Sequence, residues 1–236
     1  MRDNMKDLEI LYEDNHLIAV NKKISDIVQA DKSGDVSLEE KVKAYIKEKY
    51  GKPGEVFLGC PHRIDRPVSG VVLFAKTSKA LTRLNKMFQE HDEEIVKTYW
   101  AIVGNLPEET EGTLTHYMVR DGAKNKSYAY NQPKNGAKKA VLKYRLIGNA
   151  QRYYLLEVTL LTGRHHQIRC QLAKIGCPIK GDLKYGFPRS NENGGISLHA
   201  RSLSLTHPVK QERITITATP PLEDTLWKFF HEHLNE

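Results

Sequence analysis

The sequence predicts an α+β fold, with a mostly antiparallel mixed sheet at its core and helices and loops on its flanks. Many short runs rich in β-branched and aromatic residues follow one another, joined by short turns. Few helical patterns separate these runs, which argues against a doubly wound parallel sheet. Val71–Ala75 is a continuous apolar run, as expected of a strand buried on both faces. The 236 residues fit a single domain, 1–236.

The first elements are a hairpin and a helix. Leu8–Tyr12 and His16–Asn21 are apolar runs separated by three polar residues, a pattern typical of two paired strands. Ser37 and Glu40 stand three residues apart in a capping box, in which each side chain bonds the other residue's backbone N–H. This box predicts a helix that continues to about Lys49.

A second helix and a series of strands follow the apolar run. Thr77 and Ser78 cap the helix, in which Leu81, Leu84 and Phe88 recur at helical spacing. Four strands are expected next, at Ile95–Val103, Gly112–Met118, Lys139–Ile147 and Tyr153–Leu161. The polar stretch Asp121–Asn135 between them predicts a loop or an insertion. The remaining elements are a short helix, three strands and a last helix, at His166–Lys174, Ser197–His199, Ser202–Thr206, Arg213–Ala218 and Leu222–His233.

Composition narrows the class of protein. Hydrophobic residues make up 39% and charged residues 28% of the chain, which excludes a disordered or collagen-like protein. No apolar run approaches the ~18 residues that cross a bilayer, and the N-terminal residues lack the apolar core of a secretion signal. Three cysteines form no disulfide framework. We therefore predict a cytoplasmic protein without a membrane partner, and a monomer by default.

The net charge is +7, and much of the positive charge lies between Arg120 and Arg145. Asp121 is the only acid in this stretch, and three tyrosines are interleaved with its basic residues, which include Lys124, Lys126, Lys134, Lys138, Lys139 and Lys143. Basic runs with aromatic residues are typical of nucleic-acid binding, but they also occur on solvated surfaces. Both interpretations stay open on this stretch alone.

The segment from Cys60 to Gly70 is the densest in chemically active residues. Asp65 lies between Arg63 and Arg66, and nearby positive charge favours an ionised carboxylate. A loop beside a rigid strand is a common place for a reacting group. The alternative is an ordinary ion pair within a loop.

Two further segments carry candidate site residues. In Thr162–Arg169 a glycine permits a tight turn, after which Arg164, His166, Gln167 and Arg169 collect at a helix N-terminus, where anions bind favourably. A polar first turn facing solvent is the alternative there. In the expected strand Ile95–Val103, Lys97 and Tyr99 share one face because side chains alternate along a strand. An aromatic strand residue is, on its own, more often part of a core.

Other chemistries lack their motifs. His166 and Cys170 stand at i, i+4 and could share a metal with Cys177 or His62, yet neither Cys-x-x-Cys nor His-Glu-x-x-His occurs. There is no Walker-type loop and no Gly-x-Gly-x-x-Gly, so the sequence lacks the phosphate-binding loops that nucleotide hydrolysis and dinucleotide redox chemistry use. Ser69-Gly70 lacks the preceding glycine of a nucleophile elbow. We predict no metal and no cofactor.

Together, these segments resemble the RluA-type family of RNA pseudouridine synthases. His62–Gly70 is similar to the family's His-Arg-Leu-Asp-Arg-x-Thr-Ser-Gly, and Val71–Thr77 to the apolar strand and Ala-Lys-Thr that follow it. Thr162–Arg169 is similar to Thr-Gly-Arg-x-His-Gln-Ile-Arg, and Gly176–Gly186 to Gly-x-Pro-Ile-x-Gly-Asp-x-x-Tyr-Gly. Lys97-Thr98-Tyr99 resembles the family's Lys-x-Tyr strand.

The resemblance covers Ile10 to about Thr219 and includes three departures. Val68, Gln171 and Lys23 replace a usual threonine, a common histidine and a usual proline. None of these positions is one of the expected catalytic residues. Many relatives carry an N-terminal RNA-binding domain of the S4 type; we expect none here, and instead a single pseudouridine synthase catalytic domain.

The resemblance implies an activity and assigns roles. The expected activity is the isomerisation of a uridine in tRNA or rRNA to pseudouridine, without a cofactor. Asp65 would be the nucleophile, Tyr99 would pack on the flipped base and is a candidate base for its C5 proton, and Arg169 would pair with Asp65. Arg63 would fill the space that the flipped base leaves. RNA contacts are further expected from Arg66, Lys97, Arg164, His166 and Gln167.

Two alternatives from other classes remain. A non-catalytic RNA-binding or ribosome-assembly factor can use the same fold, and inactivity would distinguish it. A nucleoside N-glycosidase also acts at C1′, but it would release free uracil, whereas an isomerase leaves the mass of the RNA unchanged.

Overall fold

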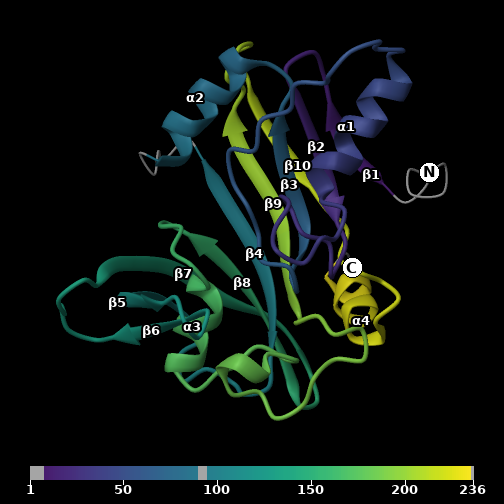
Figure 1. Ribbon diagram of the computed structural model, residues 1–236. Coiled ribbons are helices and arrows are strands. Elements are labelled where there is room, and N and C mark those ends of the chain that lie inside the picture. The colour runs from purple at the N-terminus through teal and green to yellow at the C-terminus, as the bar shows by residue number, and fades with distance from the viewer. Residues whose placement is uncertain (1–7, 90–94, 235–236) are drawn as a thin grey trace. The chain divides into compact units, whose positions relative to one another are not determined.

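The computed structural model describes residues 8–89 and 95–234. By its internal contacts the chain divides into two compact units (Figure 1). Unit 1 comprises Met1–Ile95 and Ala200–Thr219, and unit 2 comprises Val96–His199 and Pro220–Glu236. The chain therefore leaves unit 1 after Ile95, returns to it through the strand that begins at Leu198, and leaves it again after Thr219.

Unit 1 is built on an antiparallel hairpin that extends into a larger sheet. Strands β1 (Glu9–Glu13) and β2 (Leu17–Lys22) form the expected hairpin, and β2 also pairs antiparallel with β3 (Ser69–Ala75). β3 neighbours β9 (Leu198–Thr206), which pairs antiparallel with β10 (Arg213–Thr217). Every residue of β3 is buried, so the apolar run is indeed a strand covered on both faces.

The two helices of unit 1 begin where the sequence predicts. In α1 (Leu38–Lys49), Ser37 and Glu40 form the capping box, and Leu38, Val42 and Ile46 are buried at helical spacing. In α2 (Ser78–Gln89), the hydroxyl of Thr77 accepts a hydrogen bond from the N–H of Ala80. α2 packs on one face of the sheet through a cluster of buried apolar residues: Leu17, Ala19, Val71, Leu73, Ala80, Leu84, Leu203 and Leu205.

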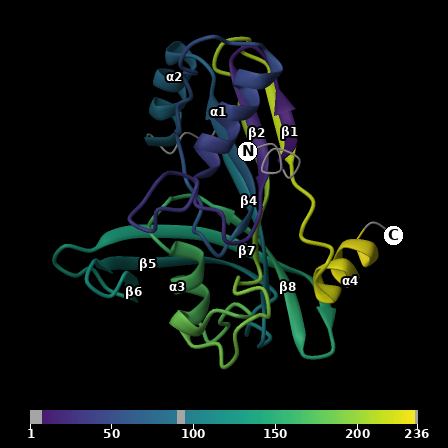
Figure 2. The ribbon, with the colours of Figure 1, turned by 45° about the vertical axis from the view of Figure 1, so that its right-hand side comes forward.

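Unit 2 is a five-stranded antiparallel sheet in the order β4-β8-β7-β5-β6. Its strands are β4 (Val96–Val103), β5 (Glu111–Asp121), β6 (Lys126–Tyr130), β7 (Lys138–Ala150) and β8 (Tyr153–Leu160). Sequential strands are joined by short turns, as Figure 2 shows for β7 and β8. β5 lies between β6 and β7, and its residues Tyr117 and Met118 have a ladder partner on both sides.

The two helices of unit 2 pack on opposite faces of this sheet. α3 (Gln167–Lys174) contributes Cys170 to a cluster with Met118 and Ala140, and the 3₁₀ turn Leu183–Tyr185 adds Tyr185. α4 (Thr225–His233) places Trp227 and Phe230 against the other face, in a cluster with Trp100, Ile102 and Leu155. The ladder register shows that these are two faces. Followed across the paired strands, it puts Met118 on the same face as Tyr99, whereas Trp100, the next residue of β4, lies on the other face.

The α+β class and the mostly antiparallel sheet are confirmed, and two local predictions are wrong. Asp121–Asn135 is not a loop, because β6 lies within it and pairs with β5. The two short strands expected at Ser197–His199 and Ser202–Thr206 are a single strand, β9. Among the described residues, no helix is both long and apolar enough to span a membrane.

Candidate active site

Asp65 lies in a loop that is fixed at both ends to β3. Gly59 and Ala75 exchange two backbone hydrogen bonds of 2.8 Å, which hold the start of the loop against the end of the strand. The carbonyl of Asp65 accepts a hydrogen bond of 3.0 Å from the N–H of Val68 and closes a turn directly before β3. Ile64 and Val68 are buried, whereas Asp65 is half-buried. The loop therefore presents its carboxylate from an anchored backbone.

Close packing at the start of β3 explains its glycine. Gly70 has a φ of +114°, in a region that disfavours residues with a Cβ. A Cβ at this position would also collide with the backbone of Ala200 in β9. Gly70 thus lets the strand that follows the Asp65 loop lie directly against β9.

Lys22 holds the same loop through hydrogen bonds to backbone carbonyls. Its ammonium group donates hydrogen bonds to the carbonyls of Lys23, Asp26 and Arg66, over 2.9, 2.7 and 3.0 Å. The side chain is only 1% exposed, and burial lowers the pKa of Lys22 to about 7. The charges of Asp26 and Asp65 oppose this shift, and those of Arg66 and Lys41 add to it. Arg66 directly follows Asp65, so Lys22 fixes the backbone beside the carboxylate.

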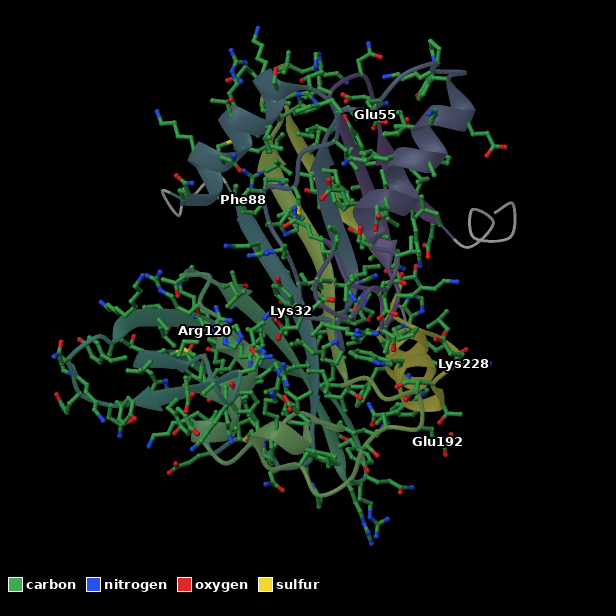
Figure 3. The ribbon with its side chains drawn as sticks, viewed as in Figure 1. Lys32, Glu55, Phe88, Arg120, Glu192 and Lys228 are labelled. Atoms are coloured by element: carbon green, nitrogen blue, oxygen red, sulfur yellow. The ribbon has the colours of Figure 1, made fainter. Side chains whose placement is uncertain are left out.

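His62 anchors the loop on its other side. Its Nε2 accepts a hydrogen bond of 3.0 Å from the N–H of Leu73, and its ring stacks on Phe88 at a centroid distance of 4.8 Å. Phe88 lies near the end of α2, where it is labelled in Figure 3. An accepting Nε2 carries no proton, so His62 is neutral in this arrangement. It holds the loop and does not supply charge.

The two arginines beside Asp65 are exposed and face different partners. Arg63 approaches the amide of Gln29 at 3.5 Å, and Arg66 forms an ion pair of 2.6 Å with Asp35. Both partners lie in the segment between β2 and α1. Among the described residues, the side-chain hydrogen bond given for Arg63 is this long one at the surface.

Lys97 and Tyr99 share one face of β4, as predicted. In the ladder they lie opposite Leu160 and Val158 of β8, whereas Thr98 and Trp100 face the other way. Burial lowers the pKa of Lys97, whose ammonium nitrogen lies within 4 Å of the position that a Cβ on Gly163 would take. Tyr99 is half-buried. Both residues therefore lie on the face of the sheet on which α3 packs.

Arg169 forms a two-point ion pair inside unit 2. Its Nε and Nη2 donate to the carboxylate oxygens of Asp182 over 2.7 and 3.0 Å, and both side chains are buried. The guanidinium carbon also lies 5.1 Å from the centre of the Tyr185 ring. Burial raises the pKa of Tyr185 to about 12. The orientation of Arg169 is thus set before any substrate binds.

Polar side chains hold the turn before α3. The amide oxygen of Gln167 accepts from the hydroxyl of Thr162 and the N–H of Arg164, and its NH₂ donates to the carbonyl of Val141. Arg164 itself donates from Nε to the carbonyl of Lys139. The turn that precedes α3, the helix of Arg169, is therefore attached to β7.

His166 is buried within the same turn. It has a φ of 54°, uncommon for a residue with a side chain, and its Nδ1 lies 3.0 Å from the hydroxyl of Tyr185. Cys170 donates to the carbonyl of Ser127. Within the described ranges, no three His, Cys, Asp or Glu side chains gather as a set of metal ligands.

The structure brings the predicted residues together in two groups. Asp65, Arg63 and Arg66 belong to unit 1, and Lys97, Tyr99, Arg164, His166, Gln167 and Arg169 belong to unit 2. The expected pairing of Asp65 with Arg169, and its meeting with Tyr99, join the two units and stay predictions. Sequence reasoning did not single out Lys22, Asp182 or Tyr185. The last two stand in the Gly-Asp-x-x-Tyr-Gly motif, which was the available signal.

Comparisons with known proteins decide the family. A family model described as RNA pseudouridylate synthase matches residues 16–174, which include Asp65, Tyr99 and Arg169. The chain belongs to this family. The predicted class, an RNA uridine isomerase, is thereby confirmed at the level of the family.

The names of two individual relatives agree with this family assignment. The chain is 35% identical over 217 residues to "Uncharacterized RNA pseudouridine synthase slr1629" of Synechocystis, covering 91% of this chain and 66% of the relative. It is 31% identical over 229 residues to "tRNA pseudouridine synthase C" of Pectobacterium carotovorum, covering 89% of this chain and 58% of the relative. The chain thus spans about two thirds or less of these two relatives.

A solved structure supports the fold. Human RNA Pseudouridylate Synthase Domain Containing 4 matches with a TM-score of 0.76 at 24% identity, over 96% of this chain and 93% of the human one. At this identity the likeness concerns the fold only.

Proposed function

We propose that this chain converts a specific uridine of an RNA to pseudouridine without a cofactor. The observation that carries the proposal is the family match, because it extends over the Asp65 loop, the Tyr99 strand and the Arg169 helix. The anchoring of the Asp65 loop by Lys22 and His62 supports it, since a reacting carboxylate needs a fixed position.

Pseudouridylation detaches uracil from C1′ of its ribose and rejoins it through C5. The reaction needs a carboxylate that attacks C1′ or the pyrimidine ring, or that assists formation of a glycal. We assign this role to Asp65. No atom is gained or lost by the RNA, and no electron is transferred to an acceptor, so the chemistry requires neither a redox cofactor nor a phosphate donor.

A uridine in folded RNA must leave its stack before Asp65 reaches it, at a cost of a few kcal/mol. Arg63 is exposed, and its planar guanidinium is suited to fill the vacated space by stacking. Tyr99 would pack on the flipped uracil, where base–aromatic stacking contributes roughly 1–3 kcal/mol. Its hydroxyl is the candidate base for the C5 proton.

Arg169 would orient Asp65 and keep it ionised. The buried pair with Asp182 supports this role, because Asp182 occupies Nε and Nη2 and so fixes the plane of the guanidinium. The proposed contacts with RNA are Arg66, Lys97, Arg164, His166, Gln167 and the stretch Arg120–Arg145. A salt-sensitive affinity would follow from the lysines and arginines among them.

The test is to incubate the protein with a transcribed RNA substrate and to measure both products of the two candidate reactions. We expect pseudouridine in the RNA, detected by a chemistry specific to this nucleoside, at unchanged RNA mass. Release of free uracil would show a glycosidase instead. Binding without either product, on RNAs modified in the cell of origin, would favour a non-catalytic factor.

The substrate is proposed to be a tRNA or a ribosomal RNA. One relative's name specifies tRNA, which supports the first class. Mapping pseudouridines in cellular RNA with and without this gene identifies the position. We further propose that the chain acts as a monomeric, single catalytic domain in the cytoplasm, to which its three free cysteines are suited.

A further inference from the structure

Unit 2 has a second surface with the composition of a nucleic-acid contact. It lies on the face of the β5-β6-β7 sheet opposite to α3, and we name it the open face. The ladder register defines its central residues: Thr113, Thr115, Tyr117 and Val119 of β5, Tyr128 and Tyr130 of β6, and Lys139, Val141 and Lys143 of β7.

The three tyrosines of the open face are neighbours in the ladder. Tyr117 lies directly opposite Tyr130 on one side and opposite Lys139 on the other. Tyr128 lies opposite Val119, two residues along β6 from Tyr130 and therefore on the same face. Directly opposite residues of a sheet have their Cβ atoms about 5 Å apart on the same face. The rings therefore form one aromatic patch.

This patch is accessible and is not covered by the helices of unit 2. Ser127 and Ala129, which alternate with the tyrosines of β6, face α3 and Tyr185 instead. α4 packs at the other end of the sheet, on Trp100 of β4 and Leu155 of β8. The three tyrosines are half-buried, and the flanking Thr113, Thr115, Lys139 and Lys143 are exposed. No other aromatic ring among the described residues stacks on them.

Positive charge surrounds the aromatic patch. The ammonium groups of Lys134 and Lys126 lie 4.4 and 5.7 Å from the ring centres of Tyr130 and Tyr128. In the described part of the chain, neither Lys139 nor Lys143 forms an ion pair. Glu157 of β8, on the same face, forms a 2.8 Å ion pair with Arg145. The surface around the rings is thus complementary to a polyanion.

We propose that the open face binds a single-stranded segment of the RNA, with bases stacked on Tyr117 and Tyr130 and phosphates near Lys134, Lys139 and Lys143. A sheet face that presents aromatic rings amid lysines is suited to this ligand, because every base has a π-face and every nucleotide a phosphate. The proposal rests on the proposed RNA substrate, and it adds Tyr117 and the stacking of bases to the basic stretch that is already proposed to contact RNA. Tyr99 and Lys97 lie on the other face of the sheet, the face on which α3 packs.

The open face would contribute affinity and not chemistry. RNA bound there would extend beyond the target uridine, so a long substrate would gain from this contact and a minimal one would not. Cross-strand tyrosine pairs also stabilise sheets, and a purely structural role predicts no effect on RNA affinity. The two roles therefore differ in a measurable property.

The experiment measures the affinity of the full chain for a fluorescein-labelled oligoadenosine of twelve nucleotides. This probe has no uridine and cannot enter the reaction. In the double variant Y117L/Y130L we expect the Kd to rise about tenfold, since leucine keeps the packing but removes the stacking surface. Y117F/Y130F keeps the rings and should retain the wild-type Kd. Tyr50→Leu, an exposed tyrosine outside the open face, is the matched control and should also bind normally.

Two results would overturn the proposal. An unchanged Kd in Y117L/Y130L would assign the tyrosines to sheet packing alone, and equal losses in the leucine and phenylalanine variants would exclude stacking. Circular dichroism and thermal melting show whether the variants are folded; should Y117L/Y130L unfold, Lys139→Gln with Lys143→Gln tests the same surface by weaker, less salt-dependent binding. Pseudouridine formation by the wild type on a transcribed RNA is measured separately. If the wild type forms none, the proposed function fails independently of these affinities.

Discussion

The ammonium group of Lys22 donates a hydrogen bond of 3.0 Å to the carbonyl oxygen of Arg66, the residue that directly follows Asp65. The same group bonds the carbonyls of Lys23 and Asp26, so its three N–H donors all meet backbone acceptors. A buried lysine that contacts only backbone in this way fixes the path of the chain. Lys22 is thus a positioning residue for the proposed nucleophile.

Lys22→Met should lower both stability and turnover. Three backbone carbonyls would lose the hydrogen bond from the ammonium group, which is expected to cost about 1–3 kcal/mol of unfolding free energy in urea denaturation. A displaced Asp65 should reduce kcat roughly tenfold with little change in RNA affinity. Lys32→Met, an exposed lysine in the segment before α1 (Figure 3), is the control and should change neither. Full turnover in Lys22→Met would contradict the positioning role.

The same variant tests how the contribution of Lys22 to the unfolding free energy depends on pH. The folded pKa of Lys22 is lowered to about 7 from an ordinary value of 10.5. Between these values the unfolded chain binds more protons than the folded one, so this group makes the unfolding free energy rise with pH. The stability difference between wild type and Lys22→Met should therefore widen from pH 7 to pH 10. A constant difference across this range would show that Lys22 keeps its ordinary pKa.

Asp182→Asn should destabilise unit 2 because it leaves Arg169 buried beside a neutral partner. Breaking a buried ion pair costs about 3–5 kcal/mol, whereas exposed pairs contribute at most about 1 kcal/mol. The exposed pair of Arg66 with Asp35 supplies the comparison. We expect a large loss of unfolding free energy for Asp182→Asn and a small one for Asp35→Asn. Equal losses would mean that the Arg169 pair has no special importance.

Tyr99→Phe separates the two roles proposed for Tyr99. Phenylalanine keeps the ring that packs on uracil and removes only the hydroxyl. If the hydroxyl takes the C5 proton, single-turnover rates should fall at least about 100-fold while the Kd for RNA stays the same. A rate equal to that of the wild type would exclude proton abstraction by Tyr99.

Local patterns predicted most elements because the relevant signals lie within a few residues. The capping box of Ser37 and Glu40 set the start of α1, and the apolar run at Val71 identified a buried strand. β6 escaped prediction because Lys126–Tyr130 is short and polar, set in a basic stretch. The signal was an alternation of Tyr128 and Tyr130 with the smaller Ser127 and Ala129.

The candidate site residues are predicted from motifs, whereas the contacts that support them are not. The predictions for Asp65, Tyr99 and Arg169 rest on motifs whose residues are close in sequence. The hydrogen bond from Lys22 to Arg66 joins residues 44 positions apart, and the pair of Arg169 with Asp182 joins residues 13 apart. Such contacts depend on how the chain packs, and no local periodicity reports them.

The central claim is that the carboxylate of Asp65 carries out the chemistry, and Asp65→Asn tests it most directly. The variant keeps the size of the side chain and removes its charge. With a competent RNA substrate we expect no detectable pseudouridine, together with wild-type melting and nearly unchanged RNA affinity. Substantial pseudouridine formation by Asp65→Asn would contradict the account.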